Sequence, residues 1–471
     1  MAVYKLFPTK DASLYSVSMS MNTGIDEILD FSTYVYDGSG QTNRALIQFS
    51  STEIVDTIDN LVGSGTAFVP STALTFPSPN GVTGTYDNVI LTGLTSGQTN
   101  ATATVIINAG GAILSANVAN TGSHYIRGEQ VSIAAGALGA GSQLIESTGL
   151  VYSNLDYSAC LRLDAATVSG LSQDATVEVF PVSSSWNMGT GKYYNNPQTQ
   201  NGVSWTYRES QGEGAWLTTG FAGGSRSTAS FSSSMEGGGT WYYQNPLGQD
   251  YVMQQAFSYS NPIDINIEVK KSITEQYQYE QNPATGQKND GFIVKQTGSQ
   301  EFLNDPNTQA TFRFFSIDTN TIYPPMLEIK WDNYRFNTGS NPNGILDTNQ
   351  ALISVYNNNG IYYSQSIAEF RIGAAPKYPI RVFQTASEYN TNHFLPEDTS
   401  LYAIKDSETN EMIIDFDSKY TKISADPSGS YFTVYMNGLE PERDYTILVK
   451  TIIDGVTNVF DEDMRFKVVN G

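Results

Sequence analysis

The chain has 471 residues, and its 25 Lys and Arg against 47 Asp and Glu give a formal net charge of −22. Because binding to phosphate needs clustered cations, this balance argues against DNA or RNA as a partner. Charged residues make up only 15% of the chain, and Gly, Ser, Thr, Asn and Tyr are abundant, which is typical of a turn-rich β protein rather than of a disordered acidic tail. A chain of this length is expected to hold roughly two to four domains.

The sequence gives no sign of export or of a membrane span. No stretch approaches the roughly 20 apolar residues of a spanning helix, so we expect no membrane insertion. Residues 1–16 turn polar at once and lack the apolar core of a signal peptide, so we expect synthesis in a cytoplasm. The single cysteine, Cys160, lies in an apolar strand pattern, and we expect a buried thiol that forms no disulfide.

Residues 1–60 and residues 61–149 differ sharply in composition. The first segment contains two candidate strands, Tyr4–Leu6 and Asn43–Phe49 (NRALIQF). In the second segment, Gly, Ala, Thr and Asn predominate, and between Leu61 and Ile145 the charged side chains are only Asp87, Arg127 and Glu129. We therefore predict that residues 61–149 form a small β module inserted into a loop of a larger domain, since loop tips tolerate insertions.

Residues 150–336 resume the larger strands, and the stretch Ala175–Trp186 (ATVEVFPVSSSW) is their centre. Apolar and polar side chains alternate up to Pro181, which predicts a strand that ends there or lies on an edge. Asn43–Phe49, Ser158–Leu163 and Pro325–Trp331 are predicted partner strands. Together they predict a large antiparallel sandwich. The convincing helix signals are few, and Ile273–Tyr279 is the one candidate.

The last part of the chain is divided at a turn-rich segment. We interpret residues 337–376 as a linker with connecting strands and residues 377–471 as a final domain. In that domain, Gly438-Leu439-Glu440-Pro441 precedes Tyr445, which resembles an immunoglobulin or fibronectin-type strand corner. We expect Tyr445 to have a structural role, with its ring over the core and its hydroxyl bonded to the backbone.

Residues that could carry chemistry are sparse. The two histidines, His124 and His393, lack partners at zinc-ligand spacing, and the chain has neither a Walker-A pattern nor a G-x-S-x-G motif. The acidic runs 415–417 and 461–463 have the composition of a hard-cation site or a glycosidase pair, but we interpret them as solvated strand ends. We expect no catalytic residues, no bound metal and no cofactor.

The five tryptophans suggest two alternatives. Trp205, Trp216 and Trp241 lie in glycine-rich loops, where exposed indole faces are suited to stacking on sugar rings. The interpretation that we favour is that they pack at subunit interfaces, where Trp is enriched. We expect Trp186 to cap one end of an apolar core and Trp331 to lie in a core.

Residues 1–60 and 150–332 together resemble the DNRLRE family, whose fold is a jelly-roll β-sandwich similar to carbohydrate-binding modules. The resemblance rests on Phe7–Ala12, Asn43–Phe49, Ala159–Leu163, Val179–Val182 with Trp186, Asp290–Lys295, Phe312–Ser316 and Pro325–Ile329. The implied fold is all-β: a jelly roll with an inserted module, followed by an immunoglobulin-like sandwich.

The insert adds a second resemblance. Its pattern Asn120-x-Gly122-x-x-Tyr125-x-x-Gly128 is similar to small β repeats of bacteriophage structural and fibre proteins. The combination of domains resembles virion structural proteins of T4-like phages of marine cyanobacteria. This implies a non-enzymatic scaffold in the neck or tail of a virion, oligomeric and in contact with other virion proteins. The alternatives are a carbohydrate-binding adhesin for host-surface glycans and, less favoured, a glycan-processing enzyme.

Overall fold

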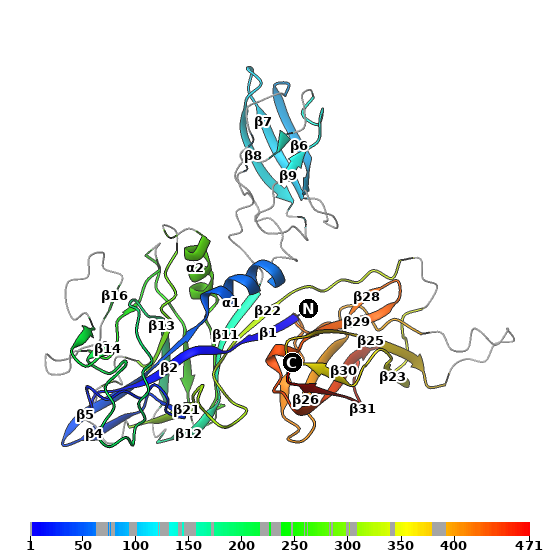
Figure 1. Cartoon of the computed structure of the whole chain (residues 1–471). Helices are drawn as coiled ribbons and strands as arrows, with labels where there is room; N and C mark the ends of the chain where they lie inside the picture. Colours follow the sequence, from blue (N-terminus) through cyan, green and yellow to red (C-terminus); the bar gives the residue numbers. More distant parts are fainter. Residues whose placement is uncertain are drawn as a thin grey trace.

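The computed structural model is built almost entirely from antiparallel β-sheets, which confirms the predicted all-β sandwich class (Figure 1). The structure describes residues 2–62, 74, 76, 81–93, 101–120, 122, 131–139, 144–145, 157–170, 174–216, 226–227, 237–245, 248–258, 260, 262–281, 283, 286–297, 301, 309–339, 344–378 and 392–471.

The N-terminal sandwich takes its strands from both sides of the insert. One sheet has the order β1 (Ala2–Leu6), β22 (Met326–Trp331), β11 (Tyr157–Leu163), β19 (Ile265–Glu268). The facing sheet has the order β18 (Gln254–Phe257), β13 (Ala175–Pro181), β20 (Phe292–Gln296), β5 (Ser39–Phe49), β2 (Pro8–Tyr15), with β4 (Thr33–Tyr36) also paired to β5. A smaller sheet has the order β12 (Ala165–Ser169), β21 (Thr311–Phe315), β3 (Ile28–Asp30).

Short elements close this sandwich. The helices are α1 (Ser51–Asp56), which continues into a π-helical turn at Thr57–Val62, and α2 (Lys270–Gln281), which covers the predicted 273–279 helix. Two-residue to four-residue hairpin strands follow β13 in the loop region: β14 (Tyr207–Ser210) with β15 (Glu213–Ala215), and β16 (Arg226–Ser227) with β17 (Trp241–Tyr242).

The alternation seen in the sequence places one face of each central strand in the core. Along β11 and β13, buried and half-buried residues alternate without interruption. β13 pairs with β20 as far as Pro181, and one further backbone bond follows, from the Val182 N–H to the Gly291 carbonyl at 2.9 Å. In β5, by contrast, residues 40–47 are all buried, because both faces of its sheet are covered.

A second apolar core covers the outer face of the six-stranded sheet. Sheet residues that point away from the main core, including Leu14, Leu46 and Ile293, pack there against tryptophans of the long loops. The N-terminal sandwich therefore has three layers: the four-stranded sheet, the six-stranded sheet and a layer of loops.

The insert forms a separate five-stranded sheet that stands apart from both sandwiches in Figure 1. Its strands, in the order β10 (Leu144–Ile145), β9 (Val131–Ile133), β6 (Gly84–Gly93), β7 (Ala101–Ile107), β8 (Ile113–Asn120), all come from residues 61–149. Ala101, Ala103, Val105 and Ile107 of β7 alternate into its apolar interior. His124 and most of the repeat-like pattern after Asn120 lie outside the described residues.

The C-terminal sandwich has two facing sheets. One has the order β23 (Ala351–Val355), β25 (Ile367–Pro376), β29 (Gly429–Tyr435), β28 (Ser424–Asp426). The other has the order β24 (Ile361–Tyr363), β31 (Val456–Val469), β30 (Arg443–Ile453), β26 (Leu401–Asp406), β27 (Met412–Ile414). A 3-10 turn, Met436–Gly438, follows β29.

The predicted start of the last domain at residue 377 is wrong. β23, β24 and β25 lie in the segment interpreted as a linker, yet they pair with β25, β31 and β29 of the C-terminal sandwich. Turn residues such as Asn357–Gly360 separate these short strands, and turn chemistry alone does not distinguish a linker from a loop within a domain. The C-terminal sandwich therefore begins before β23.

Candidate functional site

The tryptophans expected to stack on sugar are buried, so that site prediction is wrong. Trp205, Trp216 and Trp241 are at most 3% exposed and pack in the second core of this same chain. They therefore do not present free ring faces, and the favoured packing at subunit interfaces is not what the structure shows either. The reason is that the six-stranded sheet leaves apolar side chains on its outer face, and the loops fold back to cover them.

Glycines make this close packing of loop and ring possible. Gly238 has a φ of +74°, and a Cβ there would lie 2.7 Å from the Trp205 ring. The Gly237–Gly239 run therefore lets the backbone lie close to the Trp205 ring, since glycine adopts positive φ without steric cost.

A buried ion-pair network lies within the tryptophan layer. Both Arg44 and Glu301 are fully buried, and their side chains pair at 2.8 Å (Nε to Oε1) and 3.0 Å (Nη2 to Oε2). The Arg44 guanidinium lies 4.8 Å from the Trp205 ring centre and 5.2 Å from that of Trp241. Lys295 adds contacts of 3.5 Å to Glu301 and 3.1 Å to Glu178. Sequence reasoning missed this network; its one signal was an arginine inside the apolar run NRALIQF.

Trp186 and Tyr445 hold the structural positions that their motifs suggest. Trp186 is buried in the second core, where its Nε1 donates to the Asp290 carbonyl at 2.9 Å. Tyr445 is buried, its hydroxyl donates to the Glu440 carbonyl at 2.9 Å, and its ring lies 5.7 Å from that of Phe466. The Tyr445 arrangement is the backbone corner that the Gly438–Tyr445 motif predicts.

Cys160 is half-buried, and burial raises the pKa of its thiol to about 11.

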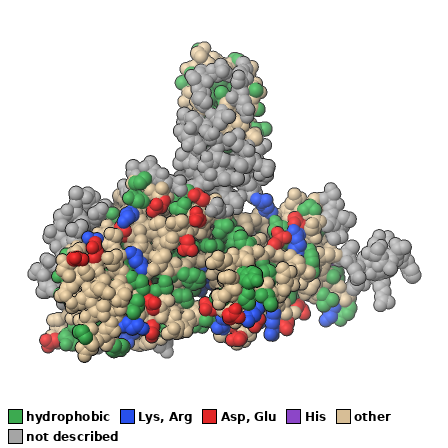
Figure 2. Space-filling view, in the orientation of Figure 1, with side chains coloured by type: hydrophobic (Ala, Val, Ile, Leu, Met, Phe, Trp, Pro, Cys, Tyr) green, Lys and Arg blue, Asp and Glu red, His purple; other side chains and the backbone are tan. Residues whose placement is uncertain are grey.

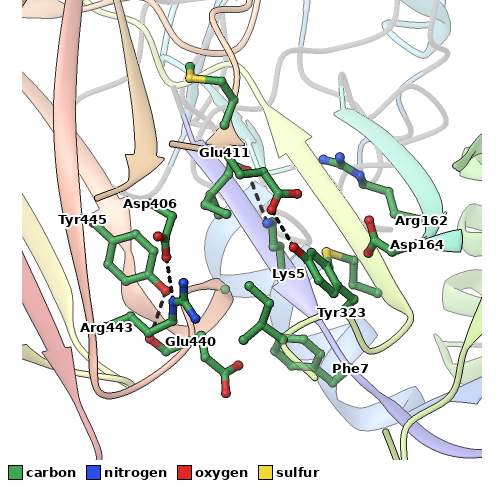
Figure 3. A pocket seen from close by; sticks show the side chains of 15 residues that line it. Lys5, Phe7, Arg162, Asp164, Tyr323, Asp406, Glu411, Glu440, Arg443 and Tyr445 are labelled. Atoms are coloured by element: carbon green, nitrogen blue, oxygen red, sulfur yellow. Dashed lines mark hydrogen bonds and ion pairs between the residues drawn. The ribbon is translucent and has the colours of Figure 1, made fainter. Parts of the chain in front are cut away.

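A small cavity among the described residues lies between the two sandwiches (Figure 3). It has a volume of about 60 Å³ and is lined by Lys5 and Phe7 of the N-terminal sandwich together with Glu440 and Tyr445 of the C-terminal one. Across it, the Tyr323 hydroxyl donates to Glu411 at 2.9 Å. Beside it, Arg443 pairs with Asp406 at 2.6 Å.

Burial shifts the titration of two groups that line this cavity. It lowers the pKa of Lys5 to about 8 and, helped by the nearby Asp264 charge, raises the pKa of Asp164 to about 6. A lysine with a lowered pKa is a feature of some nucleophilic sites. Here, however, the Lys5 Nζ donates to the Ile413 carbonyl at 3.3 Å, and the cavity has room for a few water molecules rather than a substrate.

The contacts around the cavity instead join the two sandwiches. Val3 of β1 belongs to the C-terminal core, and the Asn437 amide donates to the Lys5 carbonyl at 2.5 Å. The Tyr435 ring lies 5.8 Å from that of Tyr4 and 5.4 Å from that of Trp331. Strand β1 is thus shared by both apolar cores, so the cavity is a gap in a packed junction.

The carboxylates of the acidic runs make hydrogen bonds and ion pairs with other residues of the C-terminal sandwich. Asp417 accepts backbone N–H bonds from Lys419 and Tyr420, Asp461 pairs with Lys405, and Asp463 pairs with Arg465. In the described part of the chain, no three His, Cys, Asp or Glu side chains gather as a metal site would require. Within the same residues, no helix has the length and apolar character needed to cross a membrane.

Comparison with known proteins adds no family assignment: no family model, no curated protein and no solved structure matches this chain.

Proposed function

We propose that the chain is a non-enzymatic structural protein of a tailed-bacteriophage virion, a scaffold that joins subunits in the neck or tail. The phage assignment comes from the sequence resemblance. The observation that supports a scaffold is a pair of sheet edges in the C-terminal sandwich that carry exposed apolar side chains. The packed junction also supports a scaffold, because β1 packs in both apolar cores and so couples the two sandwiches mechanically.

The first edge is β23. Leu352 and Tyr356 are each 54% exposed, and they border a groove of about 390 Å³ whose floor includes Gly373 and Ala375 of β25. Among the described residues, no strand pairs with β23 on the side away from β25. An edge of this kind offers unpaired backbone donors and acceptors beside an apolar groove.

The second edge is β24, which pairs with β31 on one side only within the described residues. Ile361 and Tyr363 point to the same face and are each 62% exposed, while Tyr362 between them packs on Phe370 in the core. Monomeric proteins protect their edges with charges or bulges. Edges that instead carry exposed apolar side chains favour pairing with a neighbouring subunit.

The mixed surface charge of the two sandwiches is compatible with protein–protein contacts. Figure 2 shows Lys and Arg interspersed with Asp and Glu over the visible face of both sandwiches, with hydrophobic side chains between them. A face of this kind offers no concentrated positive field for nucleic acid. It is suited to a mixed interface in which apolar contacts are rimmed by polar ones.

The expected result is that the full chain self-associates through these edges. In sedimentation velocity, the weight-average mass of the wild type should rise with protein concentration. The double variant Leu352→Lys/Tyr356→Lys should stay nearer the monomer mass, because charges on an edge oppose strand pairing. Ile263→Lys is the matched control, since Ile263 is an exposed apolar residue (49%) of the N-terminal sandwich. A wild type that remains monomeric throughout, or variants that associate equally, would contradict the proposal.

A further inference from the structure

An aromatic pocket lies at one end of the N-terminal sandwich, and two of its tyrosines come from the loop segment between Trp186 and Trp205. Its cavity has a volume of about 100 Å³ and is lined by Tyr15, Asp26, Ile28, Asp30, Tyr193, Tyr194 and Arg313. These residues come from the end of β2, from β3 and the loop before it, from β21, and from the loop after β13. The pocket is therefore built where four segments meet.

The tyrosines form a graded aromatic surface. Tyr15 is buried, Tyr193 is 41% exposed and Tyr194 is 90% exposed. The Tyr193 ring lies 5.0 Å from Tyr15 at 51° and 5.0 Å from Tyr194 at 87°. The buried ring thus supports the middle one, and the outer ring turns a face toward solvent.

The loop that carries these rings is held in place by polar contacts. The Tyr193 N–H donates to Oδ2 of Asp26 at 3.2 Å, and Lys192 pairs with Glu27 at 3.1 Å. Asn195 donates its N–H to the Lys192 carbonyl at 3.0 Å, which closes a turn around the tyrosines. Fixing a contact surface before a ligand arrives lowers the entropic cost of binding.

Hydrogen-bonding groups border the aromatic surface. The Arg313 side chain is 54% exposed, and its Nε donates to Asp30 at 3.0 Å. This ion pair holds the guanidinium group beside the pocket. Asp26 offers carboxylate oxygens at the same cavity, and burial raises its pKa. Donors and acceptors at fixed positions beside a ring are suited to a ligand with several hydroxyl groups.

We propose that the exposed surface around this pocket binds a neutral oligosaccharide, with a sugar ring outside the cavity against Tyr194 and its hydroxyl groups toward Asp26 and Arg313. A pyranose has an apolar C–H face and a polar rim, which correspond to the ring and to the charged groups around it. Acidic sugars are disfavoured because, among the described residues, Asp26, Glu27, Asp30 and Asp318 lie in or near the pocket against two cations, Lys192 and Arg313. This inference does not depend on the assembly proposed above.

The test is binding of the labelled full chain to an array of neutral and acidic oligosaccharides, followed by titration calorimetry with the strongest neutral binder. Tyr194→Ala should weaken binding roughly tenfold or more, the loss expected for a central aromatic contact. Tyr194→Trp should retain binding, because it keeps a ring at the site. Tyr378→Ala is the matched control, since Tyr378 is a tyrosine of similar exposure (71%) in the C-terminal sandwich.

Three results would overturn the inference: no glycan bound, binding to acidic glycans alone, or affinity unchanged by Tyr194→Ala. Because Tyr194 is 90% exposed, its replacement should leave the fold intact, and the thermal unfolding midpoint of the variant checks this. Sedimentation of Tyr194→Ala should match the wild type, so failure here is distinguishable from failure of the proposed scaffold.

Discussion

Replacing Arg44 by Met is expected to destabilise the N-terminal sandwich by about 3–5 kcal/mol, because the change leaves a buried carboxylate without its main partner. Glu301 is fully buried, and among the described residues only the Lys295 contact at 3.5 Å would remain to compensate its charge. The double change Arg44→Met/Glu301→Leu should cost clearly less than the sum of the single changes, since it removes both charges together.

Denaturant unfolding followed by tryptophan fluorescence measures this loss of stability in the N-terminal sandwich. All five tryptophans lie between residues 186 and 331, and Trp205 and Trp241 contact Arg44 directly. Lys192→Met is the control, because its pair with Glu27 is about half exposed and such pairs contribute about 0–1 kcal/mol. An Arg44→Met loss no larger than that of the control would show that the buried network does not stabilise the fold.

Truncating Tyr445 is expected to separate the contributions of its ring and of its hydroxyl. Tyr445→Phe removes only the bond to the Glu440 carbonyl and should cost about 0.5–1.5 kcal/mol. Tyr445→Ala also removes a buried ring that packs beside Phe466, and it should cost about 3–5 kcal/mol.

Hydrogen–deuterium exchange of the full chain resolves this loss by domain. In Tyr445→Ala, amides of β26, β30 and β31 should exchange faster, because β30 pairs with both neighbours. Strands β13 and β20 of the N-terminal sandwich serve as the internal reference, since they lie outside that sheet. Equal small losses for Phe and Ala would mean that the ring contributes no packing at the corner.

Local patterns predicted the strands and one corner of the fold. The alternation along Ala175–Pro181 specified a half-buried strand, because side-chain direction in a strand has a period of two residues. The Gly438–Tyr445 spacing specified the Tyr445 bond for a similar reason: both partners lie within a few residues of each other. Such features need no knowledge of the tertiary arrangement.

Features that depend on distant partners were not predictable from the sequence. Arg44 and Glu301 are separated by 257 positions, so the apolar run around the arginine was a signal of burial but could not identify its partner. The burial of Trp205 depends on which face of the six-stranded sheet the loops cover. The glycine-rich composition of its loop instead suggested an exposed ring. Lys5 lies in the candidate strand Tyr4–Leu6, and nothing in the sequence indicated that the C-terminal sandwich covers it.

The candidate glycan pocket shows the same limit. No motif in the sequence marked Tyr193, Tyr194, Asp26 or Arg313 as residues of one site. Only the pairing of β3 with β21 brings Asp30 opposite Arg313, and only the loop contact to Asp26 places the tyrosines beside them. Composition indicated that aromatic side chains were abundant, but not which of them stay exposed.

Cryo-electron microscopy of purified phage particles that contain this chain is the most direct test of the structural role. The expected result is repeated density for both sandwiches at symmetric positions in the neck or tail, with the β23 or β24 edge against a neighbouring subunit. Copies located outside the neck and tail, or copies whose two edges face only solvent, would contradict the proposed scaffold.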